Sequence, residues 1–371
     1  MYDFINTHII IKNVYSDIDK IQSKELNNFV IKEIDSDNLE VLKTKLKSDF
    51  ITTLIYKSII DYNSIHSYDI IINEDIIHLN IISKNRSIKK SELNDIIAVI
   101  RFFRELDIEF PKITLKITIW MSDLKKMLPH TGILTSENVN TGFTIYKKSD
   151  ISKNEYDVKE IYIFRKEELH KVLIHEMIHA YDLDSYFIHN HHKYSDRLED
   201  IYNIHSKYGI KIYESYVETI AILLHCMYLS KKDKNSLNKA ILLETKYSLF
   251  QTAKILEYYN IHSIKKLKNN IYEESSIFSY YIIKSVLLFN IKAFLKMCHT
   301  HNINYIQIKK NWIAEFTELI QKSLAKKNFI HIIDKTITTI NNINNKNINN
   351  NIIKNIKNKK YILKNLKMSL L

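Results

Sequence analysis

The chain has 371 residues, 45% of them hydrophobic, a size and composition that suit one large globular domain or two smaller ones. The formal net charge is +12. Only 3 Gly and 2 Pro occur, whereas Ile, Asn and Lys are heavily used. This usage is typical of an AT-rich genome, such as that of some large DNA viruses and intracellular parasites. The lysines are scattered without interleaved aromatic residues, so we interpret the charge as codon bias and expect no nucleic-acid partner.

The first part of the chain, 1–125, is predicted to be an α+β region. A period-two alternation of apolar residues predicts strands, and an apolar spacing of three and four predicts helices. These patterns predict a strand over 7–12, a hairpin of 68–73 with 75–82, a helix over 92–106 and a strand over 112–120.

Nothing in this region resembles an export signal, because the stretch from Met1 to Asn6 lacks a basic segment followed by an apolar run. The longest apolar stretch, 280–297, is interrupted by three lysines, so we expect no membrane partner. Cys226 and Cys298 are too few for a disulfide framework. Together these features predict an intracellular, cytoplasmic protein.

A second hairpin is predicted from 140–146 and 160–164, and it leads directly into the next helix. The segment Thr141-Gly142-Phe143 is our candidate for an edge strand that holds an extended substrate by strand addition. An ordinary hairpin without a binding role is the competing interpretation.

The most informative pattern follows, His175-Glu176-Met177-Ile178-His179. Residues i and i+4 of a helix share one face, so both imidazoles can reach one metal ion. Glu176 would lie beside that ion and take a proton from water held there. The apolar, Gly- and Pro-free surroundings, 169–181, favour a buried helix over one with two surface-facing histidines.

A catalytic zinc ion takes three protein ligands, so a third ligand is required. Glu214 and Glu218 lie four residues apart on an apolar helix, where two carboxylates need partners. We expect Glu214 to bind zinc and Glu218 to orient a ligand histidine as a second-shell partner. Three alternatives stay open: the exchanged order with Glu218 as ligand, or His191 or His192 from the loop after the motif. We do not expect Asp182 to be a ligand; we expect it to lie at the surface or to contact a ligand residue without binding the metal.

The motif from His175 to His179, followed by Glu214-x-x-x-Glu218, resembles the gluzincin group of zinc metallopeptidases. There, H-E-x-x-H precedes a helix with Glu-x-x-x-Asp, so Glu218 departs from the pattern. A weaker likeness is to SprT-type metalloproteases, which share the His-Glu-Met-Ile-His-Ala start. The gluzincin resemblance covers about 140–225 and implies a zincin-like core, bound Zn²⁺ and a peptide or protein substrate, with Glu176 as the catalytic base.

The remaining chain is predicted to be helical, so the fold class is α+β with a mainly α-helical C-terminal region. The helical segments are expected at 195–206, 212–231, 235–259, 272–297, 303–325 and 328–340. The four expected regions are 1–125, a catalytic core at 126–230, a helical region at 231–340 and an Asn/Lys/Ile-rich tail at 341–371.

A non-catalytic protein is the alternative function: an inactive zincin, or a structural-zinc protein that acts as an interaction module. A structural site carries a fourth protein ligand, most often Cys or His. Cys226 and Cys298 have no nearby cysteine to pair with as ligands, and Glu176 would have no role in such a site. The sequence therefore favours an enzyme.

Overall fold

The structure is a computed structural model that describes residues 18, 20–46, 51–73, 75–84, 87–147, 157–231, 233–267, 271–345 and 361–371. The chain forms two compact units. Unit 1 comprises 1–19, 126–139 and 186–371, and unit 2 comprises 20–125 and 140–185. The four consecutive regions expected from the sequence stay a prediction, and each unit takes segments from more than one of them.

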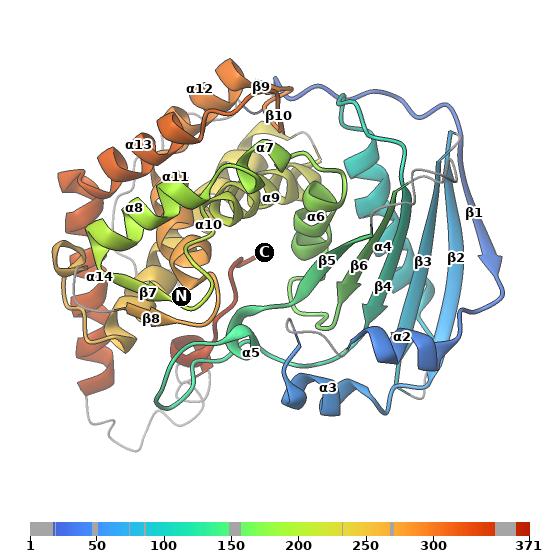
Figure 1. Ribbon diagram of the computed structural model, residues 1–371, viewed down its shortest axis with the longest axis horizontal. Coiled ribbons are helices and arrows are strands. Elements are labelled where there is room, and N and C mark those ends of the chain that lie inside the picture. Colours follow the sequence, from blue (N-terminus) through green and yellow to red (C-terminus); the bar gives the residue numbers. More distant parts are fainter. Residues whose placement is uncertain are drawn as a thin grey trace. The chain divides into compact units, whose positions relative to one another are not determined.

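Unit 2 is an α+β unit built around one sheet (Figure 1). Its elements are β1 (Phe29–Ile34), α2 (Leu39–Lys45), α3 (Thr53–Ile59), β2 (Ser64–Ile72), β3 (Asp75–Ser83), α4 (Lys90–Arg104), β4 (Thr114–Trp120), β5 (Gly142–Lys147), β6 (Val158–Ile163) and α6 (Leu169–Ala180).

The six strands lie in the order β1-β2-β3-β4-β6-β5, which places β5 at one edge. β3, β4 and β6 run parallel, whereas β1 with β2, β2 with β3, and β5 with β6 are antiparallel. The predicted hairpin of β2 and β3 is confirmed, and Asn73 turns it with a φ of 55°. The pairing of β5 with β6 is confirmed as well. The sheet is therefore mixed, in keeping with the α+β expectation.

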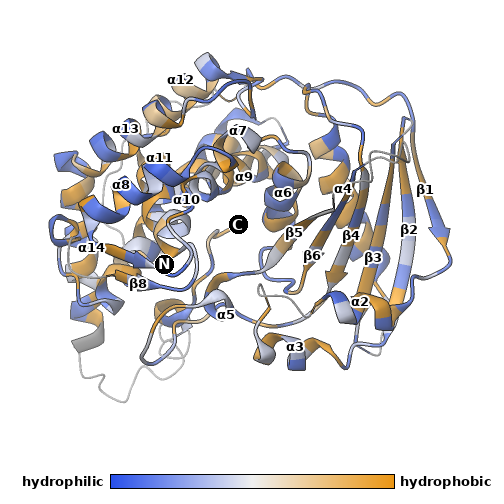
Figure 2. Cartoon of the chain, in the orientation of Figure 1, coloured by the Kyte–Doolittle hydropathy of each residue, from blue (hydrophilic) through white to orange (hydrophobic). Residues whose placement is uncertain are grey.

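Side chains of neighbouring residues in each strand lie on opposite faces of this sheet, because side chains alternate along a strand. On one face, Trp120, Tyr162 and Phe164 form a core with residues of α2 and α3. On the other face, α4 and α6 pack together, and α6 packs on β5 and β6. Apolar residues line both β3 and β4, as the colours of Figure 2 show.

Unit 1 is mainly helical and contains short strand pairs. Its elements are α5 (Ser136–Val139), α7 (Ser185–Ile188), α8 (His192–Tyr202), β7 (Ile204–Ser206), α9 (Ile212–Ser230), α10 (Lys234–Tyr258), η3 (Ile264–Lys266), β8 (Ile271–Glu273), η4 (Phe278–Ile283), α11 (Lys284–Phe289), α12 (Ile291–His301), β9 (Asn302–Ile303), β10 (Gln307–Ile308), α13 (Ile313–Leu324) and α14 (Lys327–Asn345).

An aromatic cluster holds several of these helices together. Phe187 of α7 contacts Tyr216 of α9 at 5.4 Å and Phe316 of α13 at 5.3 Å between ring centroids. Trp312 packs on the same rings, and its Nε1–H donates to Asn302 Oδ1 at 3.1 Å. Buried aromatic rings of this size supply much of the apolar area that a helical unit removes from water.

The last described segment, 361–371, is held by buried charged side chains of unit 1. Lys254 donates to the carbonyl oxygen of Ile362 at 2.9 Å, and Lys284 donates to that of Met368 at 2.6 Å. The Glu244 carboxylate accepts from the backbone N–H of Leu370 at 2.9 Å. These bonds offset part of the cost of burying the three charged groups.

Three helical predictions need correction. The segment 195–206 ends its helix at Tyr202, because Asn203 adopts φ 49° and β7 then pairs with β8. The segment 272–297 begins within β8, becomes helical only at Phe278, and breaks at Asn290. The segment 303–325 begins in the pair β9–β10 and is helical only from Ile313. Isoleucine is so frequent in this chain that apolar residues fall at helical spacing by chance. The spacing therefore did not show where these helices begin and end.

The expected helices at 92–106, 212–231, 235–259 and 328–340 are confirmed as α4, α9, α10 and α14. The strand expected at 112–120 is confirmed as β4, whereas the one expected at 7–12 lies outside the described residues. Across the described residues, no single helix is long and apolar enough to cross a membrane. Only Phe278–Phe289 together with Ile291–His301 reaches that length, and these two are bent by 94°.

Candidate metal centre

The H-E-x-x-H motif lies on α6, a helix that is buried along almost its whole length. All of its residues except His170 are buried, including the polar side chains of the motif. The helix has no Gly or Pro inside it, and it ends where Tyr181 leaves the helical region of φ and ψ. Packing against α4, β5 and β6 fixes the direction of its polar face.

The two histidines of α6 present the same ring nitrogen to each other. His175 Nε2 and His179 Nε2 are 3.2 Å apart, and the side chains are only 6% and 7% exposed. Two nitrogens held at about 2.0–2.1 Å from one tetrahedral zinc ion are about 3.3–3.4 Å apart. The pair therefore fits two ligands of one ion, although the same separation allows a hydrogen bond between the rings when one Nε2 carries a proton.

The far side of His179 contacts an acid that the sequence reasoning missed. His179 Nδ1 lies 2.8 Å from Asp184 Oδ2, and the Asp184 side chain is fully buried. The two groups are not aligned as a hydrogen bond, so the contact is electrostatic: the Asp184 charge favours the tautomer with hydrogen on Nδ1, which leaves the Nε2 lone pair for a metal. Asp184 follows a turn in which Asp182 adopts φ 53°, so helical spacing alone could not place it.

Asp182 has a different environment from Asp184. Its side chain is 39% exposed, and its Oδ2 atom lies 3.0 Å from Lys159 Nζ on β6. Asp182 thus lies at the surface, one of the two places that the sequence left open for it, and pairs with a lysine that is itself buried. The two neighbouring acids thus separate into one that supports a histidine and one that does not.

Glu176 lies against the edge strand β5. Thr144 Oγ1 donates to Glu176 Oε2 at 2.8 Å, which holds one carboxylate oxygen in place. A Cβ atom added to Gly142 would lie 3.3 Å from Glu176 Oε1 and only 2.9 Å from the carbonyl oxygen of Tyr162. Only glycine lets the strand approach this closely, so Gly142 sets the distance between β5 and the carboxylate.

The two acids of α9 have separate partners within unit 1. Glu214 Oε2 accepts a hydrogen bond from the Tyr280 hydroxyl at 3.1 Å. Tyr280 lies in η4, a π-helix, a form that is rare and often found at functional sites. Glu218 lies 3.8 Å from Lys284 Nζ, and both side chains are fully buried. Lys284 thus balances its charge, and the expected role of Glu218 behind a ligand histidine stays a prediction.

One group of buried side chains could hold a metal ion. His175, His179 and Glu214 are all buried, and imidazole nitrogen and carboxylate oxygen are ligand atoms that zinc accepts. Neither His191 nor His192 belongs to that group. The histidines belong to unit 2 and Glu214 to unit 1, so the part of Glu214 as a third ligand is a proposal.

The histidine alternatives lie at the start of α8. His191 Nδ1 is 2.8 Å from the carbonyl oxygen of Ile188, and its ring contacts Tyr213 with centroids 4.9 Å apart. Burial lowers the pKa of His191, which keeps the ring neutral. Its hydrogen bond and aromatic contact give it a structural role without a metal.

Comparison with known proteins gives one distant relative. No family model matches the chain, and no solved structure matches it. A protein of Acanthamoeba polyphaga mimivirus, named only as the uncharacterized protein R210, is 28% identical over 211 residues. The match covers 53% of this chain and 51% of that protein, so the chain spans about half the length of the relative it matches. The viral source of the relative agrees with one of the two origins that the composition suggested.

Proposed function

We propose that the protein is a zinc-dependent peptidase whose metal ligands are His175, His179 and Glu214. The observation that carries the proposal is the pair of buried imidazoles of unit 2, whose Nε2 atoms are 3.2 Å apart, close to the separation of two ligands of one zinc ion. Glu214 of unit 1, a buried carboxylate, is the proposed third ligand. Two imidazoles and one carboxylate form a ligand set of catalytic zinc sites, and they leave a fourth position for water or substrate. Magnesium and calcium prefer all-oxygen sites, so this nitrogen-rich set favours zinc.

Glu176 is the catalytic base of the proposed reaction. Bound zinc would lower the pKa of a water molecule and polarise the scissile carbonyl group. The Glu176 carboxylate takes a proton from the attacking water and then delivers it to the leaving amine. Thr144 holds Oε2 of this carboxylate through its hydroxyl, an arrangement that keeps the side chain in one orientation. With 6% exposure, the carboxylate works in a poorly hydrated environment.

The substrate of this proposed peptidase is an extended peptide bound by β5. This strand forms one edge of the six-stranded sheet, and its residue Thr144 touches Glu176. Edge strands bind extended peptides through backbone hydrogen bonds, and pockets for alternate side chains give specificity. A peptide added to β5 near Thr141–Phe143 would run past the catalytic carboxylate. The tight approach at Gly142 supports this edge as the substrate-binding one.

The test combines a metal assay with one substitution. Purified protein should carry one zinc ion per chain and cleave members of a fluorescent peptide library. Glu176→Gln should keep the zinc and lose cleavage by about a hundred-fold or more, because it removes the base without removing a ligand. Glu167→Gln is the matched control, since this buried glutamate lies 3.9 Å from Lys125 and near the start of α6. It should retain cleavage.

Three outcomes would overturn the proposal. Protein without stoichiometric zinc would remove its basis, and full activity in Glu176→Gln would remove the base from the mechanism. Zinc binding without cleavage of any library member would favour the non-catalytic alternative, in which the site serves structure or interaction.

A further inference from the structure

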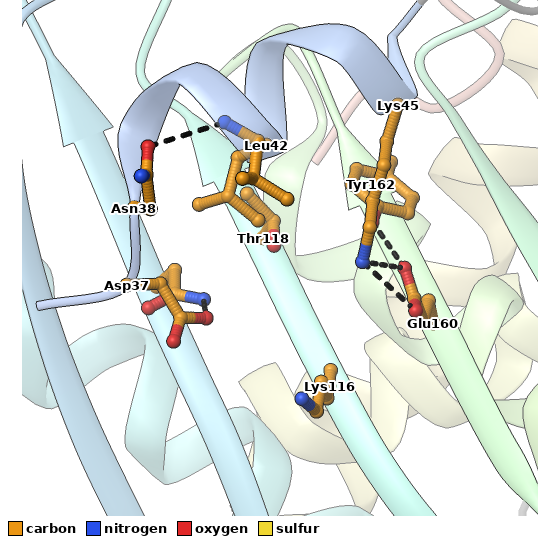
Figure 3. A pocket seen from close by; sticks show the side chains of 10 residues that line it. Asp37, Asn38, Leu42, Lys45, Lys116, Thr118, Glu160 and Tyr162 are labelled. Carbon is orange, nitrogen blue, oxygen red and sulfur yellow. Dashed lines mark hydrogen bonds and ion pairs between the residues drawn. The ribbon is translucent and has the colours of Figure 1, made fainter.

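A second candidate site lies in unit 2, on the opposite face of the sheet from α6. A cavity of about 250 Å³ opens between α2 and the strands β3, β4 and β6 (Figure 3). The face follows from strand alternation: Lys159 contacts Asp182 beyond α6, whereas its neighbour Glu160 lines the cavity. The site therefore does not depend on the proposed peptidase function.

Polar side chains occupy positions where a central strand normally carries apolar ones. Asn80, Thr118 and Glu160 come from three adjacent strands, and each is only 2–3% exposed. Strands covered by helices usually present Val, Ile or Leu there, because a buried polar group is costly unless bonded. Polar groups placed against that rule often mark a functional site.

One wall of the cavity is an ordered chain of hydrogen bonds. Ser67 Oγ donates to Asn80 Oδ1 at 2.6 Å, and Asn80 Nδ2 donates to Asp37 Oδ2 at 2.7 Å. Asp37 lies at the mouth, exposed to solvent, and within the described residues no cation forms an ion pair with it. Its orientation is thus fixed while its charge remains available to a ligand.

The opposite wall is a carboxylate that is already neutralised. Lys45 Nζ lies 2.9 Å from Glu160 Oε2, and the Tyr162 hydroxyl donates to the same oxygen. Burial, and then this hydrogen bond, raise the pKa of Tyr162, so the hydroxyl keeps its proton and remains a donor. Glu160 therefore needs no further cation.

The floor between the walls carries two groups that have no partner. Lys116, half-buried on β4, makes no hydrogen bond or ion pair with any other described residue, and Figure 3 shows it apart from both walls. The Thr118 hydroxyl also has no hydrogen-bond partner among the described residues, although its side chain is 2% exposed. Thr118 lines the cavity and its hydroxyl oxygen is not closed off from it, so a ligand there can bond this group.

We propose that this cavity binds a small zwitterion of amino-acid size. Lys116 would bind its carboxylate, Asp37 its ammonium group, and Thr118 a further polar atom. A simple anion would be repelled by Asp37 and a simple cation by Lys116, whereas a zwitterion meets one open charge of each sign. The volume is below the range of about 300–1,000 Å³ that is typical for drug-sized ligands, which limits the ligand to a small molecule.

Isothermal titration calorimetry with each of the twenty common L-amino acids tests this proposal, with acetate and methylammonium as single-charge probes. We expect at least one amino acid to bind, and both single-charge probes to bind at least about ten-fold more weakly. Lys116→Met should weaken binding about ten-fold or more, and Thr118→Val about three-fold, because each removes one bond to the ligand. Lys112→Met, an exposed lysine just before β4, is the matched control and should bind as the natural protein does.

The proposal is wrong if none of the twenty amino acids binds, if acetate binds as tightly as the best amino acid, or if Lys116→Met retains full affinity. Circular dichroism and thermal unfolding check that each variant is folded. Thr118→Val is nearly isosteric, so it tests the cavity independently if Lys116→Met does not fold. Full affinity in Thr118→Val together with an unfolded Lys116→Met would also overturn the assignment.

Discussion

The contact between His179 and Asp184 gives the sharpest prediction about the proposed zinc site. Asp184→Asn keeps the shape of the side chain and removes its charge. Loss of a carboxylate behind a ligand histidine typically lowers metal affinity by about 10–100-fold, or about 1.4–2.7 kcal/mol. The atoms are 2.8 Å apart and Asp184 is fully buried, so water cannot replace the carboxylate. We expect about ten-fold for Asp184→Asn, which keeps an acceptor, and about a hundred-fold for Asp184→Ala.

The assay is the zinc dissociation constant, measured by competition with a chelating dye. Asp182→Asn is the control, because Asp182 lies two residues away but pairs with Lys159 and is 39% exposed. Its zinc affinity should change less than about two-fold, because Asp182 contacts Lys159 and not a ligand histidine. Equal affinities for the Asp184 variants and the natural protein, with all variants folded by circular dichroism, would refute the reasoning that Asp184 orients a metal ligand.

Two further predictions concern unit 1. Tyr280→Phe removes the hydrogen bond to Glu214 and should lower zinc affinity by about two- to ten-fold in the same dye assay. The control is Tyr258→Phe, because the Tyr258 hydroxyl donates to the Gly132 carbonyl oxygen, and its zinc affinity should not change. Equal effects of the two substitutions would contradict the role of Tyr280. Burial raises the pKa of Glu273 from 4.5 to about 8. Ionising this side chain in the folded protein therefore costs about 5 kcal/mol more than in the unfolded chain. The free energy of unfolding should fall as the pH rises from 4.5 to 8. Glu273→Gln should flatten that fall in urea titrations at pH 5 and pH 8, and an unchanged slope would show that Glu273 is not its source.

The H-E-x-x-H motif and the strands beside it could be predicted from the sequence because local patterns carry them. Period-two alternation predicted β4 and both hairpins, and the i, i+4 spacing predicted the paired histidines of α6. The segment Thr141-Gly142-Phe143, singled out as an edge strand, contains the glycine at which β5 approaches Glu176.

Features that depend on contacts between distant segments were not readable. β7 and β8 pair although Ile204 and its partner Ile271 are 67 positions apart, and each strand has only three residues, too few for alternation to reveal. Asp184 reaches His179 only because the chain reverses after α6. Lys116 and Thr118 looked like the polar side of a strand, and the sequence did not show that α2 partly covers that side.

Strand β5 connects the two candidate sites of unit 2 through its alternation. Thr144 bonds Glu176 on one face, whereas its neighbour Phe143 stacks on Tyr162 of the cavity wall with ring centroids 5.2 Å apart. A shift of β5 by one residue would exchange these faces and disrupt both contacts at once. The close approach at Gly142 and six residue pairs with β6 oppose such a shift. The register of one edge strand therefore determines both the position of the proposed catalytic base and the packing behind the proposed zwitterion site.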